Sequence, residues 1–67
     1  MIKFSERLKE IRNERKLTQK EVAKQLNIST TCYAGYEQGY REPDYQTLRK
    51  ICKYFNVTSD YLLGLED

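Results

Sequence analysis

The stretch from Leu17 to Ser29 constrains the fold more than any other part of the chain. Its Thr18-Gln19-Lys20-Glu21 segment matches a capping box, in which the Thr hydroxyl and the Glu carboxylate each satisfy a backbone amide that the first helical turn leaves unpaired. We therefore expect a helix that begins at Gln19 and buries a stripe of apolar residues, Val22, Ala23 and Leu26. Asn27 can adopt the left-handed conformation that ends such a helix, and Ile28 is expected to anchor the turn in the core.

A second short helix is expected directly after this turn. Ser29 is a favourable N-cap, and Gly39 should end the helix. Tyr33 and Tyr36 are three residues apart and should both face inward. This arrangement leaves outside an unusual face of small residues with almost no charge, made of Thr30, Thr31, Ala34 and Gly35. A solvated helix normally carries Lys and Glu on its outer face, so this face indicates close approach to another surface.

The order of these two helices points to nucleic acid. Two short helices joined by a turn of about three to four residues form the unit that places its second helix in the major groove of DNA. The leading interpretation is therefore a sequence-specific DNA-binding protein, with the two helices at about residues 19–38 and double-stranded DNA as the partner.

The rest of the chain predicts three more helices and no strand. A first helix, which Ser5 or a neighbour can open, has one apolar stripe made of Phe4, Leu8 and Ile11. Asp44 is expected to cap a fourth helix, whose stripe is Leu48, Ile51, Cys52 and Phe55. Thr58 should cap a short fifth helix over residues 59–63. We therefore predict an all-α, compact five-helix fold, with residues 1–67 forming a single domain.

Charge is distributed unevenly along the chain. The net charge is +2, but residues 1–24 hold eight Lys or Arg against four Glu, whereas residues 25–67 hold four basic against six acidic residues. A phosphate backbone would favour the first part, although a solvated helix surface explains the pattern equally well. No segment approaches the ~18 apolar residues of a membrane span, and residues 1–10 lack the apolar core of a signal peptide. Cytoplasmic residence, without membrane contact, is therefore expected.

The composition argues against catalysis and against a metal, a cofactor or a small-molecule ligand. The chain has no His, the commonest general base, and its three glycines are too scattered to cradle a phosphate. Its two cysteines, Cys32 and Cys52, form no CxxC motif and have no His to complete a metal site. Both are expected to be reduced thiols, with a disulfide as the lesser alternative.

Several short motifs occur in a fixed order between Phe4 and Leu65, nearly the whole chain. They are Leu8-x-x-Ile11-Arg12, Leu17-Thr18-Gln19-x-Glu21-Val22-Ala23, Ile28-Ser29, Tyr36-Glu37-x-Gly39, Arg41-x-Pro43, Leu48 and Asn56-Val57-x-x-Asp60-Tyr61-Leu62-Leu63-Gly64. Each motif alone is weakly specific, but together they resemble the phage repressor and Cro-type helix-turn-helix family, also called the Xre type. The resemblance implies a repressor-like DNA-binding domain that acts as a small transcriptional regulator, blocking polymerase at a short operator.

The resemblance also implies that residues 30–38 form the recognition helix, with its N-terminal half against base edges in the major groove. The base-reading positions would be Thr30, Thr31, Ala34 and Gly35. A Thr can hydrogen-bond a base edge or set its methyl against that of thymine. Gly35 falls where such proteins often carry a long polar side chain, so fewer direct contacts are expected; a tolerated surface glycine is the alternative.

Contacts to the DNA phosphates are implied around this helix. The backbone amide or the side chain of Gln19 would donate to a phosphate, because a helix N-terminus favours an anion. The other phosphate candidates are Lys20, Ser29, Gln38, Tyr40 and Arg41. For Gln38 and Tyr40 an ordinary surface position is an equal alternative.

Arg12 and Glu37 match a paired Arg and Glu that in this family link the first helix to the end of the recognition helix. A structural ion pair is preferred here over a direct DNA contact, because an isolated charge beneath the helix would be costly. The sequence departs from the family at Tyr33, where a branched aliphatic residue is usual. The packing under the recognition helix must therefore be wider, or the ring must reach its edge.

A homodimer interface is expected in the C-terminal third, made of Ser59, Tyr61, Leu63 and Leu65. Once Val57 and Leu62 are assigned to the core, the other three apolar side chains have no obvious intramolecular partner. Ser59 stands where the family commonly has an apolar residue, which weakens the expected dimer. Such a dimer would bind a palindromic operator. The alternative is a protein-interaction module, such as an antitoxin-like partner of a second protein, that uses Tyr45, Tyr54 and the C-terminal leucines.

Overall fold

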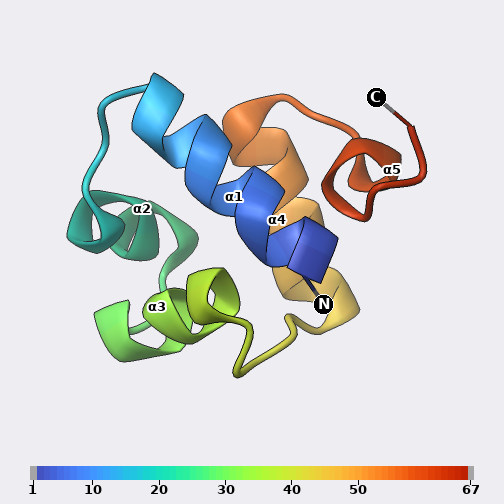
Figure 1. Cartoon of the computed structure of the whole chain (residues 1–67). Helices are drawn as coiled ribbons and strands as arrows, with labels where there is room; N and C mark the ends of the chain where they lie inside the picture. The colour runs from blue at the N-terminus through green and yellow to red at the C-terminus, as the bar shows by residue number, and fades with distance from the viewer. Residues whose placement is uncertain (1, 67) are drawn as a thin grey trace.

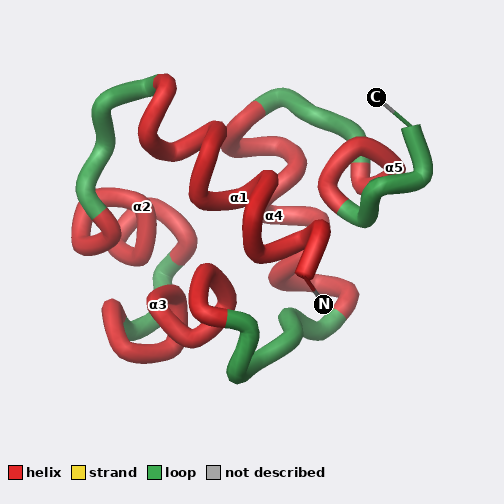
Figure 2. The backbone as a smooth tube through the Cα atoms, in the orientation of Figure 1, coloured by secondary structure: helices red, strands yellow, loops and turns green. Residues whose placement is uncertain are grey.

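Five helices make up the fold in the computed structural model, which describes residues 2–66. They are α1 (Ile2–Glu14), α2 (Gln19–Leu26), α3 (Thr30–Gln38), α4 (Tyr45–Phe55) and α5 (Ser59–Leu62). Residues 2–66 contain no strand, so the prediction of an all-α, five-helix fold is confirmed. Figure 2 shows short connections between the helices, the longest being the segment 39–44 that joins α3 to α4.

α1 crosses the middle of the molecule and organises the other helices around it (Figure 1). It packs against α3 on one side and α5 on the other, while α2 contacts both α3 and α4. Every helix contributes to one core, whose buried apolar residues are Phe4, Leu8, Ile11, Val22, Ala23, Leu26, Tyr33, Tyr36, Ile51, Phe55 and Leu62. The arrangement leaves α2 and α3 together at one edge of the molecule, with the outer face of α3 uncovered by any other helix (Figure 1).

The helix ends follow the signals in the sequence. Thr18, Ser29, Asp44 and Thr58 each accept a hydrogen bond from the amide three residues on, as N-caps do. The capping box of α2 is complete, because the Glu21 carboxylate also accepts from the Thr18 amide at 2.8 Å. Asn27, Asn56 and Gly39 end their helices in the left-handed conformation.

The first helix begins earlier than predicted. α1 starts at Ile2, so Ser5 lies inside the helix and does not open it. Ser5 is buried, and its hydroxyl donates to the carbonyl oxygen of Tyr36 at 2.9 Å. A serine within a helix is neutral to unfavourable locally, but here its hydroxyl satisfies a buried carbonyl of α3. Of the two options, Ser5 or a neighbour, the first was therefore wrong: Ser5 lies inside α1 and its hydroxyl makes a tertiary contact.

Two residues of the C-terminal patch do have intramolecular partners, contrary to the expectation from sequence. Tyr61 and Leu63 are half-buried and pack against the core. The guanidinium carbon of Arg7 lies 4.6 Å from the centre of the Tyr61 ring, a cation–π contact between α1 and α5. Leu65 remains 74% exposed.

Tyr33 is wholly buried, so its ring does not reach the edge of the core. It meets Tyr36 edge-on, with ring centres 6.4 Å apart. The alternative in which the ring reaches the edge is thus wrong. No described residue makes a hydrogen bond of good geometry with the Tyr33 hydroxyl, which lies beside Arg12 and Glu37. Burial raises the pKa of Tyr33 well above its usual range.

A bidentate ion pair joins α1 to the end of α3. The Arg12 Nε donates to Glu37 Oε2 at 2.6 Å, and Arg12 Nη2 donates to Glu37 Oε1 at 3.0 Å. The same guanidinium donates to the Leu17 carbonyl at 2.7 Å, and the Gln19 side-chain amide donates to Glu37 Oε1 at 3.2 Å. The side chains of Arg12 and Glu37 are 12% and 2% exposed, so the pair is largely withdrawn from water. These four residues hold α1, the α1–α2 turn, α2 and α3 in one arrangement.

The ionised form of Glu37 is favoured by this arrangement. Burial by itself would raise the pKa of Glu37, but the hydrogen bonds from Arg12 and Gln19 outweigh that effect and hold its pKa below the usual range. The charge of Glu37 is therefore retained at neutral pH inside the protein.

We predict that Arg12→Ala lowers the melting temperature in the absence of DNA. The substitution leaves the Glu37 carboxylate buried without its main partner, which costs about 3 kcal/mol, near the lower end of the effect of breaking buried pairs. A domain of this size has little stability to spare. Arg49→Ala, at an exposed arginine of α4, is the matched control and should leave the melting temperature nearly unchanged. An unaltered melting curve for Arg12→Ala would contradict the structural role of the pair.

We also predict that Glu37 contributes to a pH dependence of stability. Because its pKa is lowered by folding, its contribution is complete above the unfolded-state pKa of about 4.3 and is lost as the pH falls through the lower folded-state pKa. Denaturant unfolding of the wild type and Glu37→Gln should therefore differ most at neutral pH and converge in acid. Glu14→Gln, at an exposed carboxylate of α1, is the control. An equal difference between wild type and Glu37→Gln at every pH would refute this account.

Candidate nucleic-acid interface

The outer face of α3 presents small, uncharged side chains. Thr30 and Thr31 are exposed in the first turn of the helix, and Ala34 is half-buried. The one charged residue within α3 is Glu37, which is buried in the ion pair with Arg12. The residues of α3 itself therefore place no long charged side chain on this face.

Gly35 is buried, although the sequence analysis placed it on the outer face. The cover comes from the chain that follows the helix: the amides of Gly39, Tyr40 and Arg41 all point to the Gly35 carbonyl, those of Tyr40 and Arg41 at 3.0 and 3.2 Å. The side chain of Arg41 then lies across Gly35. A Cβ on Gly35 would be 3.0 Å from Arg41 Cγ and only 2.8 Å from Arg41 Cδ, and the second distance is shorter than Cβ atoms show in folded proteins. The expectation of an exposed Gly35 was wrong because periodicity gives no information about the path of the following loop.

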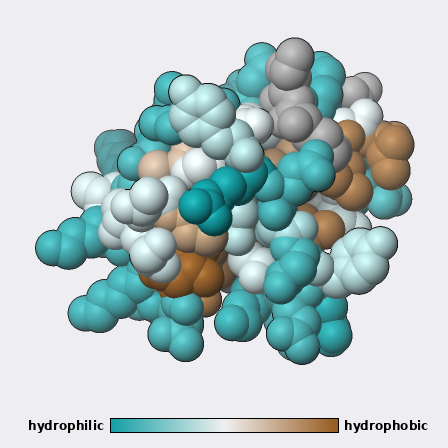
Figure 3. Space-filling view, turned by 90° about the horizontal axis from the view of Figure 1, so that it is seen from below, coloured by the Kyte–Doolittle hydropathy of each residue, from teal (hydrophilic) through white to brown (hydrophobic). Residues whose placement is uncertain are grey.

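These residues surround one open concavity of about 530 Å³ on the α3 surface. It is lined by the four positions assigned to base reading, Thr30, Thr31, Ala34 and Gly35, together with Gln38, Tyr40 and Arg41. Seen from the α3 side, the molecular surface is mostly hydrophilic or of intermediate hydropathy, with apolar areas small and separate (Figure 3). The structure thus brings seven of the sequence-selected residues together on one surface.

The remaining phosphate candidates lie at the two helix starts. Gln19 and Lys20 form the first turn of α2, where Lys20 is exposed and the Gln19 side chain is engaged with Glu37. That hydrogen bond uses one of the two side-chain N–H donors of Gln19, and its backbone amide at the helix start is also placed to meet an anion. Ser29 is exposed and accepts from the Cys32 amide at 3.0 Å, which leaves its hydroxyl hydrogen available as a donor.

The two cysteines are free and half-buried. The disulfide alternative is therefore not adopted, and burial raises the pKa of the Cys52 thiol. Within residues 2–66, no group of three or more His, Cys, Asp or Glu side chains is placed to hold a metal ion. None of the described helices is long and apolar enough to cross a membrane.

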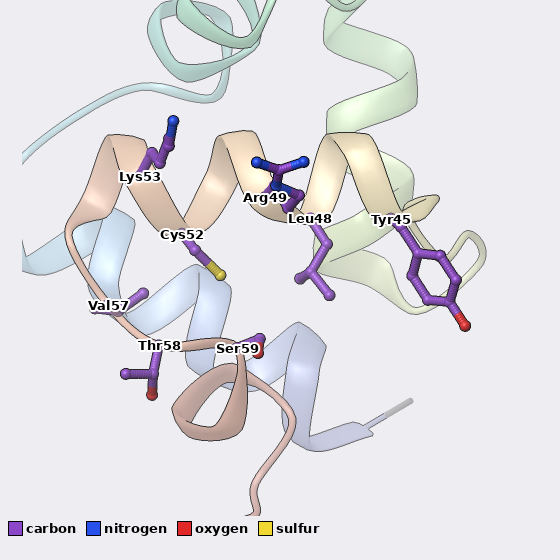
Figure 4. A pocket seen from close by; sticks show the side chains of 8 residues that line it. All are labelled: Tyr45, Leu48, Arg49, Cys52, Lys53, Val57, Thr58 and Ser59. Atoms are coloured by element: carbon purple, nitrogen blue, oxygen red, sulfur yellow. The ribbon is translucent and has the colours of Figure 1, made fainter.

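A second concave surface lies between α4 and the start of α5, with a volume of about 320 Å³. Leu48, Cys52 and Val57 point into it, and Arg49 and Lys53 lie on its α4 side (Figure 4). The sequence analysis assigned these three apolar residues to the core, but all three are only half-buried. The core covers only part of the apolar stripe of α4. The position of α5 in the tertiary structure decides which part of the stripe stays accessible.

Comparison with known proteins agrees with this geometry. The sequence model of the helix-turn-helix family matches residues 8–62. The chain is 45% identical over 64 residues to the transcriptional regulator ImmR of Bacillus subtilis, covering 96% of this chain and 50% of that protein. It is 50% identical over 60 residues to the uncharacterised regulator YqaE of the same organism, covering 90% of this chain and 52% of that protein. The chain thus spans about half the length of these curated relatives.

A solved structure shares the fold. It is a point variant of the restriction-modification controller protein C.Esp1396I, which matches with a TM-score of 0.78 and 28% identity over 96% of this chain and 81% of that one. The resemblance inferred from the motifs is confirmed by these matches. The five helices occur in the expected order, the family model matches most of the chain, and a solved relative has the same fold. The chain therefore belongs to the helix-turn-helix family of transcriptional regulators.

Proposed function

We propose that this chain is the DNA-binding unit of a transcriptional repressor that occupies a short operator and blocks polymerase there. The observation that carries the proposal is the outer face of α3, whose own exposed residues carry no charge and which forms an open concavity together with Tyr40 and Arg41 of the following loop. A major groove about 12 Å wide admits an α-helix, and small side chains permit its backbone to approach the bases closely.

Thr30 and Thr31 are the proposed base-reading residues at the start of α3, with Ala34 beside them. Both threonines are exposed and stand in the first turn, the part of a recognition helix that contacts base edges. Their hydroxyls can donate to or accept from a base edge, and their methyl groups suit the methyl of thymine.

The proposed phosphate contacts lie on both sides of this helix. The backbone amide of Gln19 and the ammonium group of Lys20 are at the start of α2, where the helix dipole favours an anion. Ser29, Gln38 and Tyr40 lie at the two ends of α3, and all three are exposed. Such contacts set the register of the helix in the groove without reading the sequence.

We further propose that the protein binds a palindromic operator as a homodimer. One recognition helix contacts only a few base pairs, and a two-fold axis doubles the site, with half-sites about 34 Å apart. The proposed interface consists of Ser59, Tyr61, Leu63 and Leu65, next to the groove between α4 and α5 that Ser59 also lines. Because Tyr61 and Leu63 are already half-covered by the core, the interface would be small and the dimer would be completed on DNA.

The alternative role as a protein-interaction module has less support. Of the residues that suggested it, Tyr54 is half-buried and packs edge-on against Phe55 at 4.9 Å. Of those residues, Tyr45 and Leu65 are 87% and 74% exposed and remain open to a partner. They are too few for the large apolar patch that marks a stable protein interface.

We predict that Thr31→Ala and Lys20→Ala weaken DNA binding in different ways. After a binding sequence has been selected from random duplexes, Thr31→Ala should weaken that site by about 1–3 kcal/mol and spare random DNA, because it removes a base contact. Lys20→Ala should weaken both alike and reduce the salt dependence of binding by about one phosphate contact. Fluorescence anisotropy at several salt concentrations measures both effects. Identical profiles for the two variants would contradict the assigned roles, and failure to select any sequence would contradict the proposed function.

We predict that Leu65→Glu weakens operator binding by opposing dimer formation. Leu65 is 74% exposed, so the change should not destabilise the monomer. The control is Asn13→Glu, which makes the same change in charge at an exposed position near the end of α1, the end that lies away from α5 (Figure 1). Sedimentation velocity with and without operator DNA should show two wild-type copies per operator, and a loss of the second copy in Leu65→Glu alone. One wild-type copy per operator, with unaltered binding by Leu65→Glu, would rule out this interface.

A further inference from the structure

We infer that Arg41 is a base-reading residue that occupies the position left vacant by the missing side chain of Gly35 and recognises guanine in the major groove. This inference rests on the proposed function. It changes the role of Arg41, which the sequence analysis assigned to a phosphate contact.

The backbone places Arg41 beside Gly35. Gly39 ends α3 with a φ of 83°, a conformation that glycine adopts without strain, and this turns the chain back along the helix. The Gly35 carbonyl then receives the amides of Gly39, Tyr40 and Arg41, the last at 3.2 Å. With its backbone tied to Gly35, the Arg41 side chain leaves the loop directly beside the outer face of α3.

The side chain then fills the space of residue 35. Three successive atoms of Arg41, Cγ, Cδ and Nε, lie 3.0, 2.8 and 3.3 Å from the position of a Cβ on Gly35. A side chain on residue 35 and the observed position of Arg41 are therefore mutually exclusive. The lack of a side chain at this base-facing position is compensated by an arginine that enters from the loop.

The guanidinium is available for a ligand. Arg41 is exposed, and no described residue forms a hydrogen bond or ion pair with its guanidinium. It lines the same concavity as Thr30 and Thr31, which face the bases in the proposed complex. An arginine at such a place can donate two parallel hydrogen bonds to O6 and N7 of guanine, the commonest specific contact in the major groove.

The position of Arg41 also explains why residue 35 is a glycine. Glycine within a helix is less stable than alanine, so its presence in α3 needs a local cause. Here the cause is the passage of the Arg41 side chain over the helix at a distance that a Cβ would prevent. Gly35→Ala should accordingly displace Arg41 without unfolding α3.

The test begins with a sequence selected by the wild-type protein from random duplex DNA. Each guanine of the selected site is then replaced by 7-deazaguanine, which keeps the base pair but lacks the N7 acceptor. We expect one guanine per half-site at which this replacement weakens wild-type binding by about 10-fold or more, within the range for loss of a bidentate base contact. Arg41→Ala should bind the unmodified site more weakly and be insensitive to that replacement.

Two further variants separate base reading from charge and from folding. Gly35→Ala should lose the same sensitivity to 7-deazaguanine while melting no lower than the wild type. Arg49→Ala removes an equal charge from an exposed position of α4 and should keep the sensitivity to 7-deazaguanine. Uniform weakening of every site by Arg41→Ala, with a lower salt dependence and retained sensitivity to 7-deazaguanine, would assign Arg41 to a phosphate and overturn the inference alone. Absence of any selected sequence for the wild type would overturn the proposed function together with it.

Discussion

The buried ion pair between Arg12 and Glu37 is the contact on which the rest of the arrangement depends. Its partners lie on α1 and α3, and its remaining hydrogen-bonding groups are used by the Leu17 carbonyl and the Gln19 side chain. A buried pair of charges is not a strong source of stability, but its geometry admits few alternatives. Because it connects the two helices of the motif to α1, it sets the orientation in which α3 faces outward.

The outer face of α3 shows how a short loop can alter the chemistry of a helix surface. Gly35 removes a side chain, Gly39 turns the chain back, and Arg41 returns to cover the vacant position. The long polar group thus comes from outside the helix. This arrangement joins two segments that a comparison of helix positions alone would treat as independent, and a substitution at residue 35 acts through Arg41 as well as at its own site.

Much of the fold followed from local signals. The bounds of α2, α3 and α4 could be predicted because the effects that set them operate within a few residues. These effects are N-caps such as Thr18 and Ser29, left-handed residues such as Asn27, and apolar stripes at helical spacing. The motif order then indicated the family. Ser5 misled the prediction of α1, since its hydroxyl satisfies the Tyr36 carbonyl of α3 in place of its own helix N-terminus. Tyr61 and Leu63 misled the prediction that the C-terminal apolar residues lack intramolecular partners, because their partners are distant in the sequence.

What the sequence by itself determined was therefore the set of helices, their order and, except for Gly35, the residues of α3 that face outward. The tertiary structure alone decided which side chains share a site. Burial of Gly35 depends on where a loop six residues later lies, and the open groove beside Leu48 depends on the position of α5. Helix caps and periodicity are properties of neighbouring residues, whereas a site is a property of the distances between residues that only packing brings together.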